Sequence, residues 1–269
     1  MQKGRGEMSS QLSDGLYESL LTNNLVEAIK DFGFRRIDKI SGEDLDQHLL
    51  RVIAKALVEK FSTLKKTDEK ISFANELLAL IGTEVRVVSG ADAEILLALV
   101  FNPLKGTKHL VDRPVLGLSD IGLLTNSSVG LNVGSQLRRE LPSADNVYIL
   151  MSFVKKAGIA HIEQQLRDLI DRGIEVRLLT TVYMGATDAE ALDRLVTDLG
   201  VKVKVSYDTK TTRLHAKAWL LERNSGFSTA FVGSSNLSNP ALSSGLEWNV
   251  RLSQVSSPAV VKEFKTAFE

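Results

Sequence analysis

The chain has 269 residues, no cysteine, and 33 acidic and 33 basic side chains. Without cysteine it can form neither a disulfide framework nor a thiolate zinc site. Its formal net charge of zero argues against binding to nucleic acid through overall charge, so such binding requires a local basic face. No apolar run approaches the roughly 20 residues that cross a membrane, and residues 1–6 lack the apolar region of a secretory signal. We therefore expect a cytoplasmic protein with two domains.

Residues 1–108 are predicted to form a mainly helical domain. Apolar residues recur at helical spacing in residues 16–32, 44–61, 68–81 and 91–101, and Ser41 is placed to cap the second of these helices. Residues 85–88 are predicted as a short strand, and residues 102–106 break the pattern. No pattern in this half indicates chemistry, so we expect a module for interaction or positioning.

Residues 109–269 are predicted to form an α/β domain. Apolar runs predict strands at 146–151, 175–180, 201–205, 229–232 and 247–252, besides a strand through residues 214–222. Helices are predicted at 159–171, at 187–199 behind a capping box of Thr187 and Glu190, and after Pro258. Strands that alternate with helices favour a sandwich with a mixed, largely parallel sheet.

One cluster in the second domain indicates a chemistry. His215 and Lys217 stand two residues apart in a predicted strand, so their side chains should share one face of it. The opposite face has the composition of a buried sheet face, with Leu214, Ala216, Ala218 and Leu220. An imidazole beside an ammonium among apolar neighbours is typical of a site that handles phosphate.

The same cluster supplies the groups that cleavage of a phosphodiester needs. A neutral histidine can attack phosphorus and form a covalent intermediate, and lysine is a compact charge suited to phosphate. Ser234 and Asn236 follow Gly233 in the sequence and can donate hydrogen bonds to the phosphate oxygens. A carboxylate on the far nitrogen of the imidazole would fix its tautomer, and Glu247 is the candidate for that role.

These residues resemble the HKD signature of the phospholipase D superfamily, which runs H-x-K-x4-D and is followed by a G-S-x-N segment. The resemblance covers His215, Lys217, Ser234, Asn236 and Glu247, which stands eleven residues after Asn236, as in nuclease members of the superfamily. Glu222 stands where the family usually has Asp, a position that is mainly structural there. Ser235 and Glu222 are therefore expected to support the site, and Asn224 to Gly226 to form a hairpin tip.

A second resemblance covers roughly residues 118–253. The chain is similar there to the HKD domain that precedes the motor in some bacterial superfamily II helicases, which would make it an N-terminal fragment. It has no Walker-type phosphate loop of its own. The resemblance rests on the segments Arg138 to Leu141, Met151 to Val154, Leu179 to Thr181, Gly185 to Asp188 and Gly245 to Val250.

The sequence contains one H-x-K motif, whereas in the HKD family two motifs face each other. The family's solution with one motif is a symmetric homodimer that brings both His215 side chains to one phosphate. We therefore expect a DNA nuclease that acts through a phosphohistidine and uses no cofactor or metal. One alternative is a catalytically silent module of a helicase that binds DNA or dimerises, and another is a phospholipid hydrolase. Trp219 is expected to pack on its strand, and Lys210 and Arg213 form either a phosphate-steering rim or a solvated loop.

Overall fold

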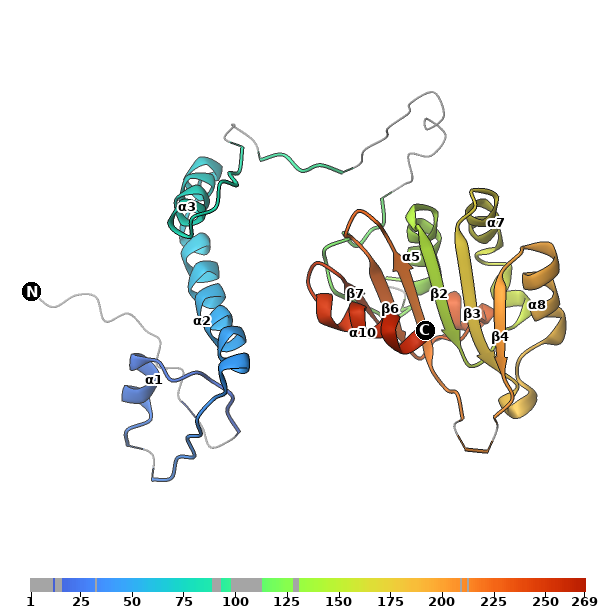
Figure 1. The fold of residues 1–269 in the computed structure, drawn as a ribbon, viewed down its shortest axis with the longest axis horizontal. Helices are drawn as coiled ribbons and strands as arrows, with labels where there is room; N and C mark the ends of the chain where they lie inside the picture. Colours follow the sequence, from blue (N-terminus) through green and yellow to red (C-terminus); the bar gives the residue numbers. More distant parts are fainter. Residues whose placement is uncertain are drawn as a thin grey trace, which may run out of the picture. The chain divides into compact units, whose positions relative to one another are not determined.

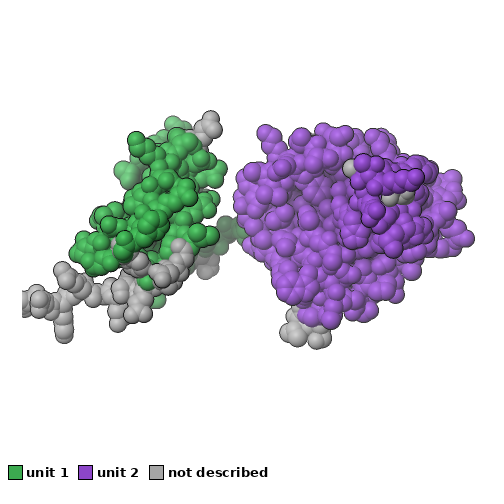
Figure 2. Space-filling model, turned by 90° about the horizontal axis from the view of Figure 1, so that it is seen from below, with its two compact units in different colours: residues 1–99 green, residues 100–269 purple. Residues whose placement is uncertain are grey.

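A computed structural model describes residues 12, 16–31, 33–88, 93–97, 113–127, 131–208, 210–211 and 213–269. The chain divides into two compact units, Met1–Leu99 and Val100–Glu269, which Figure 2 shows in different colours. The predicted domain boundary between residues 108 and 109 lies outside the described residues and stays a prediction. No helix in the described part of the chain is long and apolar enough to cross a membrane.

The regular secondary structure in the described part of unit 1 is helical, as the sequence predicts. They are α1 (Asn23–Ala28), α2 (Gly42–Thr63) and α3 (Thr67–Leu80). The Ser41 side chain caps α2 by accepting from the main-chain nitrogen of Asp44, as predicted. The predicted helix at 16–32 is much shorter, because the side chain of Thr22 caps a helix that begins only at Asn23.

Two other predictions for unit 1 are wrong where the structure describes them. Residues 85–88 form no strand, because the main chain of Val87 pairs with the side chain of Asn75 instead of with a second strand. Residues 93–97 are not helical, and the remainder of the helix predicted at 91–101 lies outside the described residues.

Unit 2 is built on a mixed sheet of seven strands in the order β1-β7-β6-β5-β2-β3-β4 (Figure 1). The pairs β2/β3 and β3/β4 are parallel, and the other four neighbouring pairs are antiparallel. Five strands therefore run in one direction, and only β5 and β7 run in the other. The predicted α/β fold with a mixed sheet is confirmed, although only two of the six neighbouring pairs are parallel. The strands are β1 (Gly122–Leu124), β2 (Asn146–Met151), β3 (Glu175–Thr181), β4 (Lys202–Ser206), β5 (Lys217–Glu222), β6 (Thr229–Gly233) and β7 (Asn249–Ser253).

Most helices of unit 2 cover one face of the sheet. Side chains such as Leu137, Leu166 and Leu195 enter one apolar core with Ile149, Trp219 and other strand residues. Trp219 is thus packed, as expected. The elements between the strands are α5 (Val133–Glu140), η2 (Leu141–Ser143), α6 (Lys156–Ile159), α7 (Glu163–Asp171), η3 (Tyr183–Gly185), α8 (Ala189–Asp193), η4 (Arg194–Asp198) and α9 (Asn239–Leu242).

The opposite face of the sheet is covered by α10 (Pro258–Phe268), red in Figure 1. Val261, Phe264 and Phe268 of α10 pack on strand residues that include Tyr148 and Leu220. The register aligns a second row on this face, Leu123 with Val250 and Val250 with Val232. This row is exposed, since Leu123 is 48% accessible, Val250 40% and Val232 44%.

A buried ionic cluster fixes β6 and β7 to α5. The Glu140 carboxylate is fully buried and accepts from Arg251 Nε at 3.0 Å, Arg223 Nη2 at 3.4 Å and Thr229 Oγ1 at 2.5 Å. Arg251 is also fully buried and donates to the main-chain oxygens of Gly117 and Asp120. Burial lowers the pKa of Arg223, and the Glu140 charge opposes that effect.

Two helices of unit 2 differ from the prediction in continuity or in capping. The helix predicted at 159–171 is interrupted between α6 and α7. The capping box at Thr187 does not form, because Thr187 Oγ1 donates to the main-chain oxygens of Thr181 and Ser152. Asp188 occupies the N-cap position, and its carboxylate pairs with Lys155 at 2.9 Å.

Candidate active site

The predicted site residues, except Glu222, meet at one end of the strands of the sheet, which we call the site edge. β2, β3, β4 and β6 end at this edge, and the antiparallel strands β5 and β7 begin there. The register places Met151 opposite Lys217 and Gly233 opposite Asn249. Segments that are far apart in the sequence are therefore within one or two strand spacings, about 5–10 Å, of each other.

Lys217 is the first residue of β5 and is 8% exposed. Its ammonium donates to Ser152 Oγ at 3.1 Å and to the main-chain oxygen of His215 at 2.7 Å, and it lies 3.0 Å from His215 Nδ1. Burial lowers the pKa of Lys217, and the negative charge of Glu247 opposes this shift. A desolvated ammonium held by three polar atoms is well prepared to meet a phosphate.

His215 lies just before β5 rather than within it, and its side chain is exposed. The strand prediction was therefore wrong at its start, although the pairing of His215 with Lys217 was right. The two faces of β5 do not divide as predicted either, because Ala218, Trp219, Leu220 and Leu221 are all buried. The His215 ring meets the Phe153 ring edge to face, with centroids 6.1 Å apart. An exposed imidazole that contacts an aromatic ring on one side only is accessible to a substrate.

Ser234 follows β6 and bonds to the segment before β7. Its hydroxyl donates to the Glu247 carboxylate and accepts from the main-chain nitrogen of Trp248 at 3.0 Å. Its own main-chain nitrogen donates to the oxygen of Trp248 at 3.0 Å. No hydrogen bond among the described residues joins Glu247 to the His215 ring. The orienting role expected of Glu247 therefore stays a prediction.

Asn236 and Ser235 connect the loops at this edge. Asn236 Oδ1 accepts from the main-chain nitrogen of Phe153 at 3.1 Å, so the amide is oriented by the loop after β2. Ser235 is buried and bonds to the Asn249 side chain at 2.7 Å and the Ala241 oxygen at 3.3 Å. Ser235 thus supports the loop that carries its two neighbours.

Glu222 lies at the opposite end of β5 from Lys217, roughly 17 Å away at the rise of a strand. Its carboxylate accepts from Asn146 at 3.0 Å, Tyr148 at 3.3 Å and Lys265 at 2.6 Å. Burial raises the pKa of Glu222, but these hydrogen bonds outweigh burial and hold the pKa below its usual value. Glu222 therefore ties α10 to the sheet and supports the fold, not the reacting groups.

Two contributors to the site were not assigned from the sequence. Ser152 is fully buried, donates to the Ala216 oxygen at 3.0 Å and accepts from Lys217. Phe153 packs on His215, lies 5.8 Å from the Lys217 ammonium and donates to Asn236. Their segment stood out only in the second family resemblance, and nothing local in it indicates a contact with residues more than 60 positions away.

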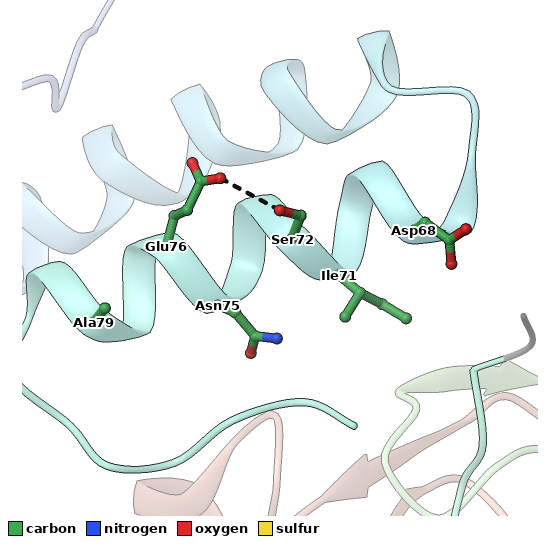
Figure 3. A pocket seen from close by; sticks show the side chains of 6 residues that line it. All are labelled: Asp68, Ile71, Ser72, Asn75, Glu76 and Ala79. Carbon is green, nitrogen blue, oxygen red and sulfur yellow. Dashed lines mark hydrogen bonds between the residues drawn. The ribbon is translucent and has the colours of Figure 1, made fainter. Parts of the chain in front are cut away.

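Other surfaces of the described residues carry less chemistry. No group of three or more His, Asp or Glu side chains among them is arranged to hold a metal ion. Arg213 stacks on Tyr183 at 5.7 Å on the rim, which leaves both predicted roles of Lys210 and Arg213 open. A hollow on α3 has no cationic side chain among its lining residues. Figure 3 shows them to be Asp68, Ile71, Ser72, Asn75, Glu76 and Ala79.

Residues 137–269 match the family model described as "Cardiolipin synthase, PLD-like domain". Over these residues the chain is similar to PLD-like domains. The match begins in α5 and runs through α10, so it includes every predicted site residue. No curated protein sequence matches the chain.

Several solved structures are similar to the chain. NucT from Helicobacter pylori is 15% identical with a TM-score of 0.42, over 55% of this chain and 94% of that chain. Nuc from Salmonella typhimurium, a phospholipase D family member, is 14% identical with a TM-score of 0.43, over 55% and 91%. Polyphosphate kinase from Porphyromonas gingivalis is 16% identical with a TM-score of 0.39, over 63% and 31%. Likenesses at this level say nothing about activity, and the predicted attachment to a helicase motor stays a prediction.

Proposed function

We propose that the PLD-like domain is a phosphodiesterase, and specifically a metal-independent DNA nuclease that acts through a phosphohistidine. The observation that carries this proposal is the pairing of Lys217 with His215. A buried ammonium lies 3.0 Å from the nitrogen of an exposed imidazole at the edge where the sheet's loops converge. Burying a charge beside an imidazole costs free energy and does not improve the packing of a core. The same charge would stabilise a bound anionic substrate.

The proposed first step is attack by Nε2 of His215 on phosphorus. A P–N bond forms while the P–O bond to the leaving group breaks, and an acid gives that oxygen a proton. Lys217 offsets the charge on the non-bridging oxygens, and Ser234 and Asn236 donate hydrogen bonds to them. Because Asn236 Oδ1 is held by Phe153, its Nδ2 group is left to face the phosphate.

In the second step, water attacks phosphorus and the P–N bond breaks. The proton of that water passes to the group that served as acid in the first step. His215 must present an unprotonated Nε2 in this cycle. A half-turn of the exposed ring moves Nδ1 away from Lys217, and we assign Glu247 as the acceptor of the Nδ1 proton in that state.

The acid of the first step is missing from a single copy, since the sequence has one H-x-K motif. We assign this role to His215 of a second copy, related by a two-fold axis. An apolar patch beside the site supports such an interface. It continues the exposed sheet row of Leu123, Val232 and Val250 with Trp248, 66% exposed, and Leu246, 82% exposed. Exposed apolar patches of this kind commonly mark protein interfaces.

A silent DNA-binding module is the second candidate. It is favoured by the position of Glu247, which bonds to Ser234 and not to the imidazole. A nuclease needs that ring oriented, whereas a binding site needs only the donors.

The test is cleavage of DNA oligonucleotides and of bis(p-nitrophenyl) phosphate in the presence of EDTA. The parent chain should cleave, His215→Ala should not, and His48→Ala should cleave at the parent rate because His48 lies on α2 in unit 1. DNA binding without cleavage by the parent would favour the silent module. Activity that is lost in EDTA and restored by magnesium would overturn the metal-independent mechanism.

A further inference from the structure

Unit 1 has little apolar core of its own. Of its described residues, only Ile71 is a buried hydrophobic. α2 and α3 meet through Phe61 and Phe73, whose rings lie edge to face with centroids 5.4 Å apart. A unit of this size that buries so few side chains gains little free energy from folding alone, so a further partner surface is required to stabilise it.

Several apolar side chains are exposed along α2. Leu49, Val52, Ile53 and Ala56 recur at the spacing of one helical face, and the first three are 41%, 38% and 52% exposed. Phe61, which packs on α3, lies on a different side of the helix. The exposed face around Val52 extends over about two helical turns. We call it the α2 stripe.

The charges along α2 distinguish between possible partners. Its first half, residues 42–52, carries Glu43, Asp44 and Asp46, with Arg51 as the exception. Its second half, residues 53–63, carries Lys55 and Lys60, with Glu59 as the exception. Arg51 already pairs with Glu18, and Asp44 binds Ser41. A second α2 in antiparallel orientation would place each acidic half beside a basic half. The two helix dipoles would then be antiparallel, which is also favourable. A parallel copy would place like charges together.

We propose that α2 is a self-association helix. Two copies of the chain would pair antiparallel through the α2 stripe, with Val52 and Ile53 near the two-fold axis and Asp46 of each copy near Lys60 of the other. Helix axes in such a contact are about 8–10 Å apart. This pairing is separate from the proposed interface in the PLD-like domain. It would nevertheless hold two half-sites at a high effective concentration.

The chain contains no cysteine, so single cysteines can report this geometry without background. Ile53→Cys, Asp46→Cys and Lys60→Cys would each be made in the full chain and treated with a short bismaleimide. We expect Ile53→Cys to form dimers alone. Asp46→Cys and Lys60→Cys should cross-link efficiently only when the two variants are mixed. Ala54→Cys, exposed on the opposite side of α2, is the control and should remain uncross-linked.

The same experiment in a Val250→Asp background separates this inference from the proposed function. The cross-links should persist there, because they do not depend on the PLD-like domain or on activity. Efficient Asp46→Cys dimers without mixing would show a parallel pair and overturn the proposal. Absence of Ile53→Cys dimers, with normal helix content by circular dichroism, would overturn it too, as would loss of all α2 cross-links in the Val250→Asp background.

Discussion

The ammonium of Lys217 lies 3.0 Å from Nδ1 of His215 and donates to the main-chain oxygen of the same residue at 2.7 Å. Lys217 is fixed as the first residue of β5, whereas His215 stands just outside the strand. The buried lysine thus holds the segment that presents the exposed imidazole. Loss of a partner of Lys217 should therefore change the position of His215. Ser152, in the segment that follows β2, is one such partner.

Ser152→Ala tests Ser152 as a positioning residue. Its Oγ accepts from the Lys217 ammonium at 3.1 Å. A hydrogen bond to a charged group contributes about 1.5–3 kcal/mol to stability, so we expect a lower melting temperature. The ammonium would also lose its position, and kcat should fall about tenfold or more. Loss of this acceptor also disfavours the charged lysine, and the alkaline limb of the kcat profile should move to lower pH. Ser72→Ala, on α3, is the matched control. An unshifted alkaline limb would remove Ser152 from this role.

Lys217→Met should stabilise the fold while it abolishes cleavage. Burial lowers the pKa of Lys217, so folding at neutral pH carries the cost of desolvating a charged ammonium. That cost is present below the folded pKa and disappears as pH rises through it toward the unfolded value of about 10.4. We expect a melting temperature above that of the parent at pH 7.

The advantage of Lys217→Met should shrink between pH 7 and pH 10, and calorimetry at both values measures it. A melting temperature of Lys217→Met below that of the parent at pH 7 would contradict the assignment of Lys217 as a desolvated, functional charge. A difference in melting temperature that grows with pH would contradict it too.

Glu140→Gln should destabilise unit 2 strongly. Glu140 is the carboxylate between two buried arginines, Arg223 and Arg251. Removing one partner of a buried ionic cluster costs about 3–5 kcal/mol, which corresponds to a fall on the order of 10 °C in melting temperature. Asp168→Asn, which neutralises an exposed carboxylate that accepts from Gln164, should change the melting temperature little. Equal melting temperatures for Glu140→Gln and the parent would show that the cluster is not required.

Val250→Asp tests the interface proposed beside the site. The side chain is partly exposed on the sheet face away from the main core, so the domain should fold. Two copies would bring the new carboxylates into an apolar contact, and cleavage should fall at least tenfold. Val196→Asp, on η4, should keep the parent activity. Parent activity in Val250→Asp would place the interface elsewhere.

Mixing the parent with His215→Ala shows independently whether two copies share one site. If both histidines serve one phosphate, a fully exchanged equal mixture should keep about one quarter of the parent activity, because only parent–parent dimers are competent. Half of the parent activity would mean that each copy works alone.

Much of the site could be predicted because its strongest signals are local. The spacing of His215 and Lys217, and the turn from Gly233 to Asn236, depend on short stretches of chain. The contact of Ser152 with Lys217 could not be predicted, because it depends on the register of β2 against β5. Glu222 was grouped with the site by the motif, but a strand that begins at Lys217 carries Glu222 to the far edge.

The fold shows the same division between local and distant causes. The α2 cap at Ser41 and the strand at 146–151 formed as predicted. The capping box failed because Thr187 bonds to the ends of two strands, a use that only the tertiary structure reveals. The strand predicted at 85–88 likewise did not form, because the main chain of Val87 bonds to the side chain of Asn75 instead of to another strand.

The central claim is that His215 forms a covalent bond to phosphorus, and trapping that intermediate tests it most directly. Oligonucleotides labelled at the 5′ end or, separately, at the 3′ end would be mixed with excess enzyme and quenched in alkaline denaturant during the first turnover. We predict that one of the two labels becomes attached to the peptide that contains His215, is stable in alkali, is released by acid, and is absent in His215→Ala. Cleavage in the first turnover with no labelled protein, or cleavage by His215→Ala at the parent rate, would contradict the account.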